Sequence, residues 1–140
     1  ATARSGDDEM ATRVREHQAR RGDSWTTVEE PLALAEVLRD NVTARRPALG
    51  DCLTLWLTNV MLSDRDPDQE SRRLIESLGI LDGPVVFVSN EVGLGIVPDN
   101  ALARAFRDHA GQLNQRIAAA AQRVEFIAAG LPMTLKNEHI

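Results

Sequence analysis

The sequence has one cysteine, Cys52, and no tyrosine among its 140 residues. A single thiol cannot form an internal disulfide, which excludes a disulfide-stapled secreted domain and fits a reducing compartment. No apolar run reaches the ~18 residues that a membrane-spanning helix needs, and the first residues lack a signal-peptide pattern. From these absences we predict a cytoplasmic protein without a membrane span.

Positive charge is also limited, because 16 Lys and Arg stand against 21 Asp and Glu and give a net charge of −5. The basic residues are spread along the chain, so the sequence does not indicate a nucleic-acid partner. Hydrophobic residues make up 43% of the chain, which is ordinary for a globular protein. A chain of this length can bury one proper core, so we predict one domain over residues 1–140.

Segments with helical and strand-like patterns alternate along the chain. Apolar spacing and cap residues predict helices over residues 7–20, 31–46, 52–62, 74–78 and 101–123. Short apolar runs predict strands over residues 25–28, 47–51, 84–88 and 124–129, with 130–132 closing the last one. The polar stretch 63–69 is expected to be an exposed loop. This alternation predicts an α/β fold with a mostly parallel sheet flanked by helices.

Several single residues are expected to mark the ends of these helices. Ser5 and Asp8 have the spacing of a capping box, and Gly22 follows the first predicted helix. Pro31 suits the first position of the second helix, and Asp99 or Asn100 suits the N-cap of the long helix after it.

The stretch from Val85 to Asn100 carries the strongest pattern. Residues 85–88 are apolar on both faces, which is typical of a strand buried inside a parallel sheet. Asn90, Glu91 and the Gly93–Gly95 loop follow directly. In open α/β sheets, ligands bind at the carboxyl ends of the strands, so these residues are candidates for a site.

Residues 1–3 are also predicted to be the tail of a strand. Three predicted strands then end in polar residues: Thr2, Asp51 and Asn90 with Glu91. Parallel strands bring such ends to one edge of the sheet. A carboxylate at a strand end beside a nucleotide commonly holds Mg²⁺, directly or through water, which makes Asp51 a candidate metal residue. The alternative is that Asp51 is only the N-cap of the segment that starts at Cys52.

His17 is the histidine with the most informative surroundings, because Gln18, Ala19, Arg20 and Arg21 follow it at the end of the first predicted helix. Its imidazole could attack phosphorus while the arginines neutralise phosphate oxygens. The alternative is a half-buried histidine on the Met10–Val14 face, and the pattern by itself favours this alternative. His109 is expected to be structural and His139 to lie in a frayed tail.

The segment Val88–Pro98 resembles the signature of the bifunctional adenosylcobinamide kinase / adenosylcobinamide-phosphate guanylyltransferases of cobalamin biosynthesis. Further blocks resemble this family in the family's order. They are Ala1–Ala3, Asp8–Met10 with Arg13 and His17, Arg20–Arg21 with Trp25–Thr27, Glu29, Asp51–Asn59, Phe106–Arg116 and Gly130–Lys136. The resemblance covers essentially the whole chain and implies a sheet of the P-loop NTPase (RecA-like) type.

The resemblance implies a two-part activity. His17 would attack the α-phosphorus of GTP, release pyrophosphate and carry GMP, which then passes to adenosylcobinamide phosphate to give adenosylcobinamide-GDP. The kinase half would phosphorylate adenosylcobinamide with GTP or ATP. The residues that match GTP-binding positions are Ala1, Thr2, Ala3, Gln18, Ala19, Arg20, Arg21, Glu29 and Asp51.

The resemblance also suggests roles for the metal and for the loop. Asp51 would hold Mg²⁺ through water, and Asn90 and Glu91 are candidates for the wall of the active site. The loop that continues to Pro98 is a candidate for that wall or for a subunit contact. A homo-oligomer is expected, with a trimer as the family's form.

One departure from the family pattern is large. Family members begin with a strand, a Gly-rich phosphate loop ending in Gly-Lys-Ser and a helix, a module of roughly 30 residues. No such loop occurs in these residues. We therefore expect a fold without this module, and kinase activity that depends on it. Two alternatives remain: a non-catalytic guanine-nucleotide-binding or assembly module of the same fold, and an unrelated α/β nucleotide-binding enzyme in which His17 is structural.

Overall fold

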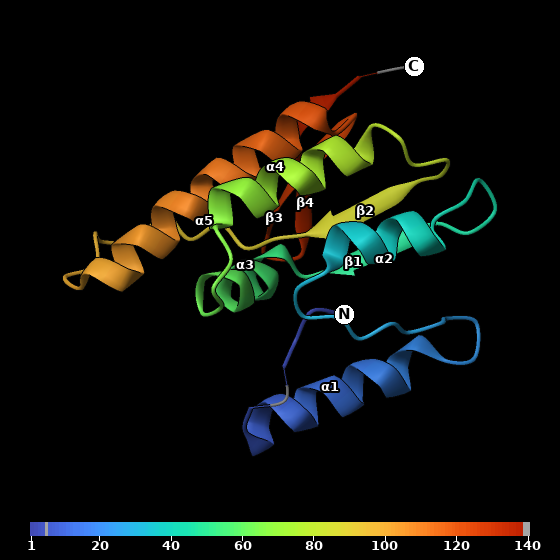
Figure 1. The fold of residues 1–140 in the computed structure, drawn as a ribbon, viewed down its shortest axis with the longest axis horizontal. Coiled ribbons are helices and arrows are strands. Elements are labelled where there is room, and N and C mark those ends of the chain that lie inside the picture. Colours follow the sequence, from blue (N-terminus) through green and yellow to red (C-terminus); the bar gives the residue numbers. More distant parts are fainter. Residues whose placement is uncertain (5, 139–140) are drawn as a thin grey trace. The chain divides into compact units, whose positions relative to one another are not determined.

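The computed structural model describes residues 1–4 and 6–138, so the expectations for Ser5 and His139 lie outside the described residues. The elements follow one another as shown in Figure 1: α1 (Asp8–Arg21), α2 (Leu34–Asn41), β1 (Ala48–Asp51), α3 (Leu53–Met61), α4 (Pro67–Leu78), β2 (Val85–Val88), α5 (Ala101–Ala120), β3 (Arg123–Ala128) and β4 (Leu131–Asn137). The chain divides into two compact units, Ala1–Asn90 and Glu91–Ile140. Within the described part of the chain, no helix is both long and apolar enough to cross a membrane.

The first unit contains a parallel pair of strands. β1 and β2 pair in register from Ala48 with Val85 to Asp51 with Val88. Gly50 lies inside β1, and the ring of Phe87 lies over it. A Cβ atom at position 50 would be 2.6 Å from Cδ1 of Phe87. The predicted strands and their parallel direction are confirmed.

Helix α3 forms the centre of the core in this unit. Its side chains Leu53, Trp56, Leu57 and Val60 are buried, as the all-round apolar pattern predicted. The indole Nε1 of Trp56 donates a hydrogen bond of 2.9 Å to the carbonyl of Leu32. Helix α4 packs against α2 and α3.

Two predicted helix starts are wrong, each because a carboxylate organises the turn. Helix α2 begins at Leu34 and not at Pro31, because the carboxylate of Glu30 accepts hydrogen bonds from the backbone N–H groups of Leu32 and Ala33. It also ends at Asn41, earlier than expected. Helix α4 begins inside the expected loop, because Asp66 caps it through the N–H group of Asp68.

Helix α1 matches its predicted span, with Gly22 at φ 62° after its last residue. Its cap is Asp7, whose side chain accepts from the N–H of Met10 at 2.7 Å. No residue of α1 is buried. The expected strand over residues 25–28 is absent as a strand in the structure.

The expectation that β2 is buried on both faces is wrong. Its side chains alternate, and Val86 and Val88 are 61% and 42% exposed. Successive side chains of a strand point to opposite faces, and the face that carries Val86 and Val88 is left uncovered by the other described residues.

The second unit contains α5 and an antiparallel hairpin. The side chain of Asn100 caps α5 by accepting from the N–H of Ala103, which confirms one of the two predicted caps. The helix ends at Ala120 and not near residue 123, because β3 begins at Arg123. β3 turns at Gly130, with φ 74°, into β4, which the sequence analysis missed. The described residues therefore form an α/β structure with one parallel and one antiparallel pair of strands, so less of the sheet is parallel than predicted.

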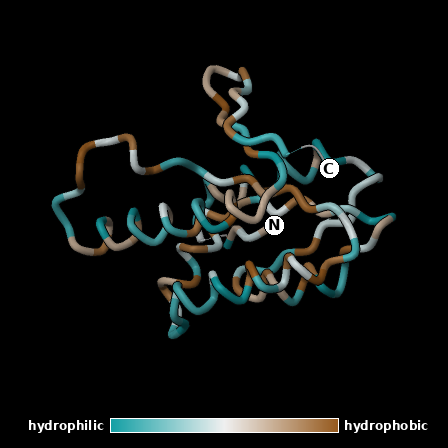
Figure 2. The backbone as a smooth tube through the Cα atoms, turned by 90° about the horizontal axis from the view of Figure 1, so that it is seen from above, coloured by the Kyte–Doolittle hydropathy of each residue, from teal (hydrophilic) through white to brown (hydrophobic). Residues whose placement is uncertain are grey.

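The loop before α5 exposes several apolar side chains. Leu94, Ile96 and Val97 are 79%, 97% and 59% exposed. In Figure 2 this loop is the long bend at the left, where hydrophobic stretches alternate with paler ones. Exposed apolar residues that follow one another in this way are typical of a surface that contacts another molecule.

Candidate functional site

The stretch Ala1–Ala3 lies between two other parts of the first unit. The nitrogen of Ala1 donates to the carbonyl of Val28 at 2.8 Å, and the N–H of Glu30 donates to the carbonyl of Ala1 at 3.0 Å. On the other side, the N–H of Thr2 donates to the carbonyl of Asp51 at 3.1 Å. The structure thus brings Thr2 beside the carboxyl end of β1, as the sequence predicted. The expectation that Thr2 ends a strand is wrong, because residues 1–4 are not in a strand.

The side chain of Thr2 is almost completely buried and joins this stretch to the start of α3. Its hydroxyl donates to the carbonyl of Cys52 at 2.7 Å and accepts from the N–H of Cys52 at 3.0 Å. The peptide bond between Asp51 and Cys52 is cis. Thr2 therefore has a structural role in addition to any contact with a ligand.

Asp51 is linked to the end of α1. Its Oδ2 atom lies 3.6 Å from Nη2 of Arg21, and the two side chains are 31% and 20% exposed. Arg21 also donates to the hydroxyl of Thr27 at 3.4 Å. The alternative that Asp51 caps α3 is wrong, because the cap is Cys52, whose Sγ atom accepts from the N–H of Leu55.

A second polar contact joins α1 to the segment that follows it. Nε2 of Gln18 donates to Oε1 of Glu29 at 2.8 Å. His17 precedes Gln18 and is exposed, as are Ala19 and Arg20. The exposure of His17 contradicts the alternative of a half-buried histidine on the Met10–Val14 face.

Asn90 and Glu91 fall on different sides of the division between the two units. The N–H of Asn90 donates to the hydroxyl of Thr54 at 2.8 Å, which ties the end of β2 to the first turn of α3. Glu91 opens the second unit, where its Oε1 accepts from the N–H of Gly93 at 2.6 Å. Three of the predicted strand ends, Thr2, Asp51 and Asn90, thus gather around the start of α3.

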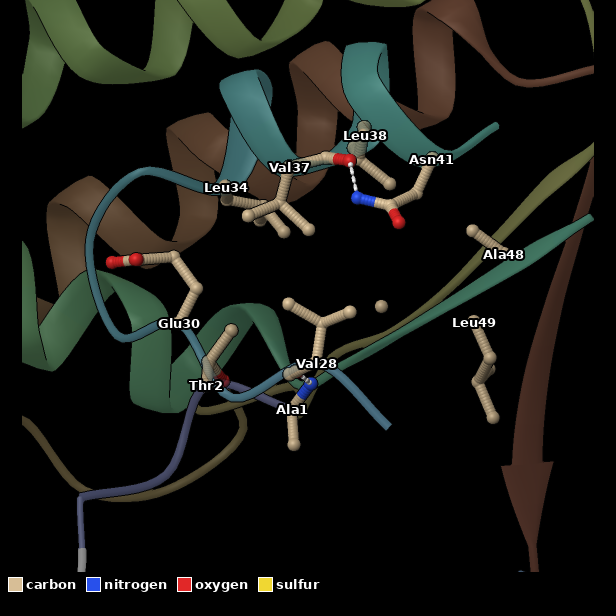
Figure 3. A pocket seen from close by; sticks show the side chains of 11 residues that line it. Ala1, Thr2, Val28, Glu30, Leu34, Val37, Leu38, Asn41, Ala48 and Leu49 are labelled. Carbon is tan, nitrogen blue, oxygen red and sulfur yellow. Dashed lines mark hydrogen bonds between the residues drawn. The ribbon is translucent and has the colours of Figure 1, made fainter. Parts of the chain in front are cut away.

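A small pocket of about 90 Å³ lies beside this group (Figure 3). Ala1, Thr2 and Val28 form one side, α2 contributes Leu34, Val37, Leu38 and Asn41, and the start of β1 closes it. Of the predicted site residues, only Ala1 and Thr2 line it. Its walls are mostly apolar, so the polar chemistry lies outside this pocket.

Glu30 lines the pocket, but its carboxylate is used by the fold. The backbone N–H groups of Ala33 and Leu32 hold the pKa of its carboxyl group below the ordinary value. Since these hydrogen bonds hold the turn that precedes α2, Glu30 has a structural role and is not a candidate acid or base.

The predicted metal residue stands alone as a protein ligand. Among the described residues, no group of three or more His, Cys, Asp or Glu side chains could hold a metal ion. Mg²⁺ does not require such a group, because it commonly takes one or two carboxylates together with water and substrate phosphates. The single carboxylate of Asp51, partly exposed at a strand end, fits that mode of binding.

Two residues that organise this region, Asn59 and Thr54, were not singled out from the sequence. The Nδ2 atom of Asn59 donates to the carbonyls of Thr2 and Pro31, and Thr54 accepts from Asn90 as described. The available signal was their polarity inside an otherwise apolar helical run.

The fold and the gathered strand ends define an α/β protein with its polar residues at the carboxyl end of a parallel strand pair. The sequence model of the family described as "Cobinamide kinase / cobinamide phosphate guanyltransferase" matches residues 1–135, and the chain belongs to this family. The predicted enzyme class, a cobinamide kinase and guanylyltransferase of cobalamin biosynthesis, is thereby confirmed.

Curated relatives agree with the family match. The chain is 55% identical to the bifunctional adenosylcobalamin biosynthesis protein CobP of Pseudomonas aeruginosa, over 99% of this chain and 81% of that protein. It is 37% identical to the bifunctional adenosylcobalamin biosynthesis protein CobU of Escherichia coli, over 97% of this chain and 83% of that protein. The protein of the same name from Salmonella typhimurium is 36% identical, over the same shares of the two chains.

Proposed function

We propose that this enzyme transfers GMP from GTP to adenosylcobinamide phosphate through a covalent intermediate on His17. The observation that carries the proposal is the attachment of α1 to the strand ends. Arg21 meets Asp51 at 3.6 Å and Gln18 meets Glu29 at 2.8 Å, on the same helix end as the exposed His17. A nucleophile on that helix end would lie near groups suited to phosphate and metal.

The first step is nucleophilic substitution at phosphorus. An unprotonated nitrogen of His17 attacks the α-phosphorus of GTP, so that a P–N bond forms while the P–O bond to pyrophosphate breaks. In the second step, a phosphate oxygen of adenosylcobinamide phosphate attacks the same phosphorus and the P–N bond breaks. The products are adenosylcobinamide-GDP and free His17.

The residues around His17 would bind the nucleotide. The guanidinium groups of Arg20 and Arg21 neutralise phosphate oxygens, which favours attack by a neutral nucleophile. The further proposed GTP-binding residues are Ala1, Thr2, Ala3, Gln18, Ala19, Glu29 and Asp51. Their support is the hydrogen-bonded arrangement that gathers residues 1–3, Glu29 and Asp51 within one unit.

Asp51 is the residue that would hold Mg²⁺, through water, as argued above from its partly exposed carboxylate. When bound, the ion supplies positive charge to the phosphates of the nucleotide. The chain's own contribution is to keep the carboxylate at the strand end, where Arg21 and the backbone of Thr2 fix its surroundings.

The remaining features of the proposal come from the family resemblance. The enzyme also phosphorylates adenosylcobinamide with GTP or ATP, in the cytoplasm. By the resemblance, this reaction depends on a phosphate loop of the P-loop NTPase type, which does not occur in residues 1–140. Residues 1–140 belong to one nucleotide-binding domain, and Asn90 and Glu91 lie in the wall of its active site. A homo-oligomer, with a trimer as the expected form, would cover the exposed apolar loop around Ile96.

The proposal is tested by replacing the nucleophile in the full-length protein. His17→Ala should abolish conversion of GTP and adenosylcobinamide phosphate into adenosylcobinamide-GDP, whereas the kinase reaction with adenosylcobinamide should continue. His109→Ala serves as the matched control and should retain both reactions. Guanylyl transfer that persists in His17→Ala would show that His17 is not the nucleophile.

A further inference from the structure

Asn59 is a buried polar residue in the middle of an apolar helix. Asn59 is 8% exposed, and Trp56, Leu57 and Val60 of the same helix are also buried. An amide placed there is unfavourable unless it is hydrogen-bonded. An apolar side chain would be more usual at this buried position, so the presence of an amide requires a specific explanation.

Both donors of this amide are directed at the backbone of other segments. Nδ2 of Asn59 donates to the carbonyl of Thr2 at 2.7 Å and to the carbonyl of Pro31 at 3.1 Å. The two carbonyls are separated by 29 positions in the sequence but meet at one side chain of α3. Asn59 thereby fixes two extended stretches to the most deeply buried helix of the unit.

These two stretches are the ones on which the proposed nucleotide site depends. Thr2 belongs to the proposed GTP-binding stretch and bonds to Asp51 and Cys52. Pro31 follows Glu29 and Glu30, and Glu30 bonds to the carbonyl of Ala1. Loss of the amide would remove one hydrogen bond from each stretch at the same point, next to the end of β1.

We propose that Asn59 is a positioning residue that holds residues 1–3 and 29–31 in the arrangement that binds GTP. It acts through the backbone of Thr2 and Pro31 and does not touch the nucleotide. This inference rests on the proposed function, since it assigns Asn59 to the same site. An apolar residue of similar size would fill the space but would leave the two carbonyls without this donor.

The test compares variants of Asn59 in the full-length protein by their steady-state constants for guanylyl transfer. Asn59→Leu removes the donors and should raise KM for GTP by about 10-fold or more, because small displacements of binding groups have large effects. The kcat value at saturating GTP should change by less than about threefold, since His17 and its helix are untouched. Asn59→Gln keeps an amide and should recover most of the affinity.

A purely structural role gives a different result. Loss of folded protein lowers the apparent kcat and leaves KM for GTP unchanged. Ser77→Ala is the matched control, because Ser77 is also buried and its hydroxyl donates to the carbonyl of Leu74 within α4. This control should lower stability without raising KM.

The outcomes separate the two proposals. If the unaltered protein forms adenosylcobinamide-GDP and Asn59→Leu has an unchanged KM for GTP, the positioning role is overturned while the proposed function stands. If the unaltered protein forms no such product, the proposed function fails first. Should Asn59→Leu not fold, Asn59→Ser removes the amide with a smaller side chain, and an unchanged KM in that variant overturns the positioning role in the same way.

Discussion

Nη2 of Arg21 lies 3.6 Å from Oδ2 of Asp51, so the last turn of α1 is joined to the carboxyl end of β1. Helix α1 contributes no buried residue, and its polar contacts therefore matter more than those of the other helices. Because Gln18 on the same turn bonds to Glu29, two contacts hold this end of the helix. His17 precedes Gln18 in this part of the helix.

Asp51→Asn should separate the metal role of Asp51 from its role in the fold. The amide keeps the shape but loses the charge, so the Mg²⁺ concentration for half-maximal transfer should rise by about 10-fold or more. The free energy of unfolding, measured with urea, should change by about 1 kcal/mol or less, because the pair with Arg21 is partly exposed. Asp40→Asn, at an exposed position of α2, is the control. An unchanged Mg²⁺ requirement in Asp51→Asn would argue against the metal role.

Glu30→Ala should destabilise the protein in a pH-dependent way. The N–H groups of Ala33 and Leu32 lower the pKa of the Glu30 carboxyl group in the folded state relative to the ordinary value of 4.5. A lowered folded-state pKa means that the ionised group adds stability above pH 4.5 and loses it as the pH falls through the folded-state pKa.

At pH 7 the loss of these two hydrogen bonds in the turn before α2 should lower the free energy of unfolding by about 1 kcal/mol. Urea titrations of both proteins at pH 7 and below pH 4 measure the difference, which should shrink at the lower pH. Glu76→Ala, on the exposed side of α4, should show no such trend. A difference for Glu30→Ala that is constant with pH would contradict the role of the ionised carboxylate in this turn.

Gly50→Ala should destabilise the parallel strand pair. A Cβ atom at this position would lie 2.6 Å from Cδ1 of Phe87, so the ring must move, and we expect a loss of about 1–3 kcal/mol. Combining it with Phe87→Leu should restore part of the loss relative to the sum of the two single changes, because the residues are in contact. Strict additivity in this double-mutant cycle would show that the ring is not the obstacle.

Gly111→Ala is the matched control for this change. Nothing lies within 4 Å of the Cβ atom that it would add, and the residue is inside α5. Alanine favours the helical state over glycine by about 0.5–1 kcal/mol, so this variant should be more stable than the original protein.

Ile96→Arg should weaken self-association of the protein. Ile96 is 97% exposed in a loop with two further exposed apolar residues, and a charge there opposes burial in a subunit contact. Light scattering or sedimentation should then show a smaller particle. Ile80→Arg places the same charge at another exposed isoleucine, outside this loop, and should leave the particle size unchanged. An oligomer that is insensitive to Ile96→Arg would place the subunit contact elsewhere.

Local patterns in the sequence predicted much of the first unit. The apolar run of α3, the valine-rich β2 and the glycine after α1 each carry a signal that is independent of distant residues. The starts of α2 and α4 could not be predicted as well, because each depends on which nearby carboxylate, Glu30 or Asp66, takes the free N–H groups. Strand β4 was missed because Gly130 and Pro132 suggested the end of a strand, whereas Gly130 forms a hairpin turn and Pro132 pairs with Ile127.

The sequence indicated candidate residues for the site, but it did not indicate the residues that hold them in place. Thr2, Asp51 and His17 have side chains whose chemistry is evident in any context. Asn59 and Thr54 support the candidate site through contacts with Thr2 and Asn90, which lie 57 and 36 positions away in the sequence. Such long-range hydrogen bonds leave no periodic pattern, so their roles required the structure.

The most direct test of the central claim is to trap the intermediate. The full-length protein is incubated with Mg²⁺ and GTP labelled at the α-phosphate, denatured and digested above neutral pH, and its peptides are mapped by mass. The account predicts an acid-labile GMP adduct on the tryptic peptide 16–20, which contains His17, and no adduct in His17→Ala. Absence of an adduct from a protein that transfers GMP, or an adduct on the peptide that contains His109, would contradict it.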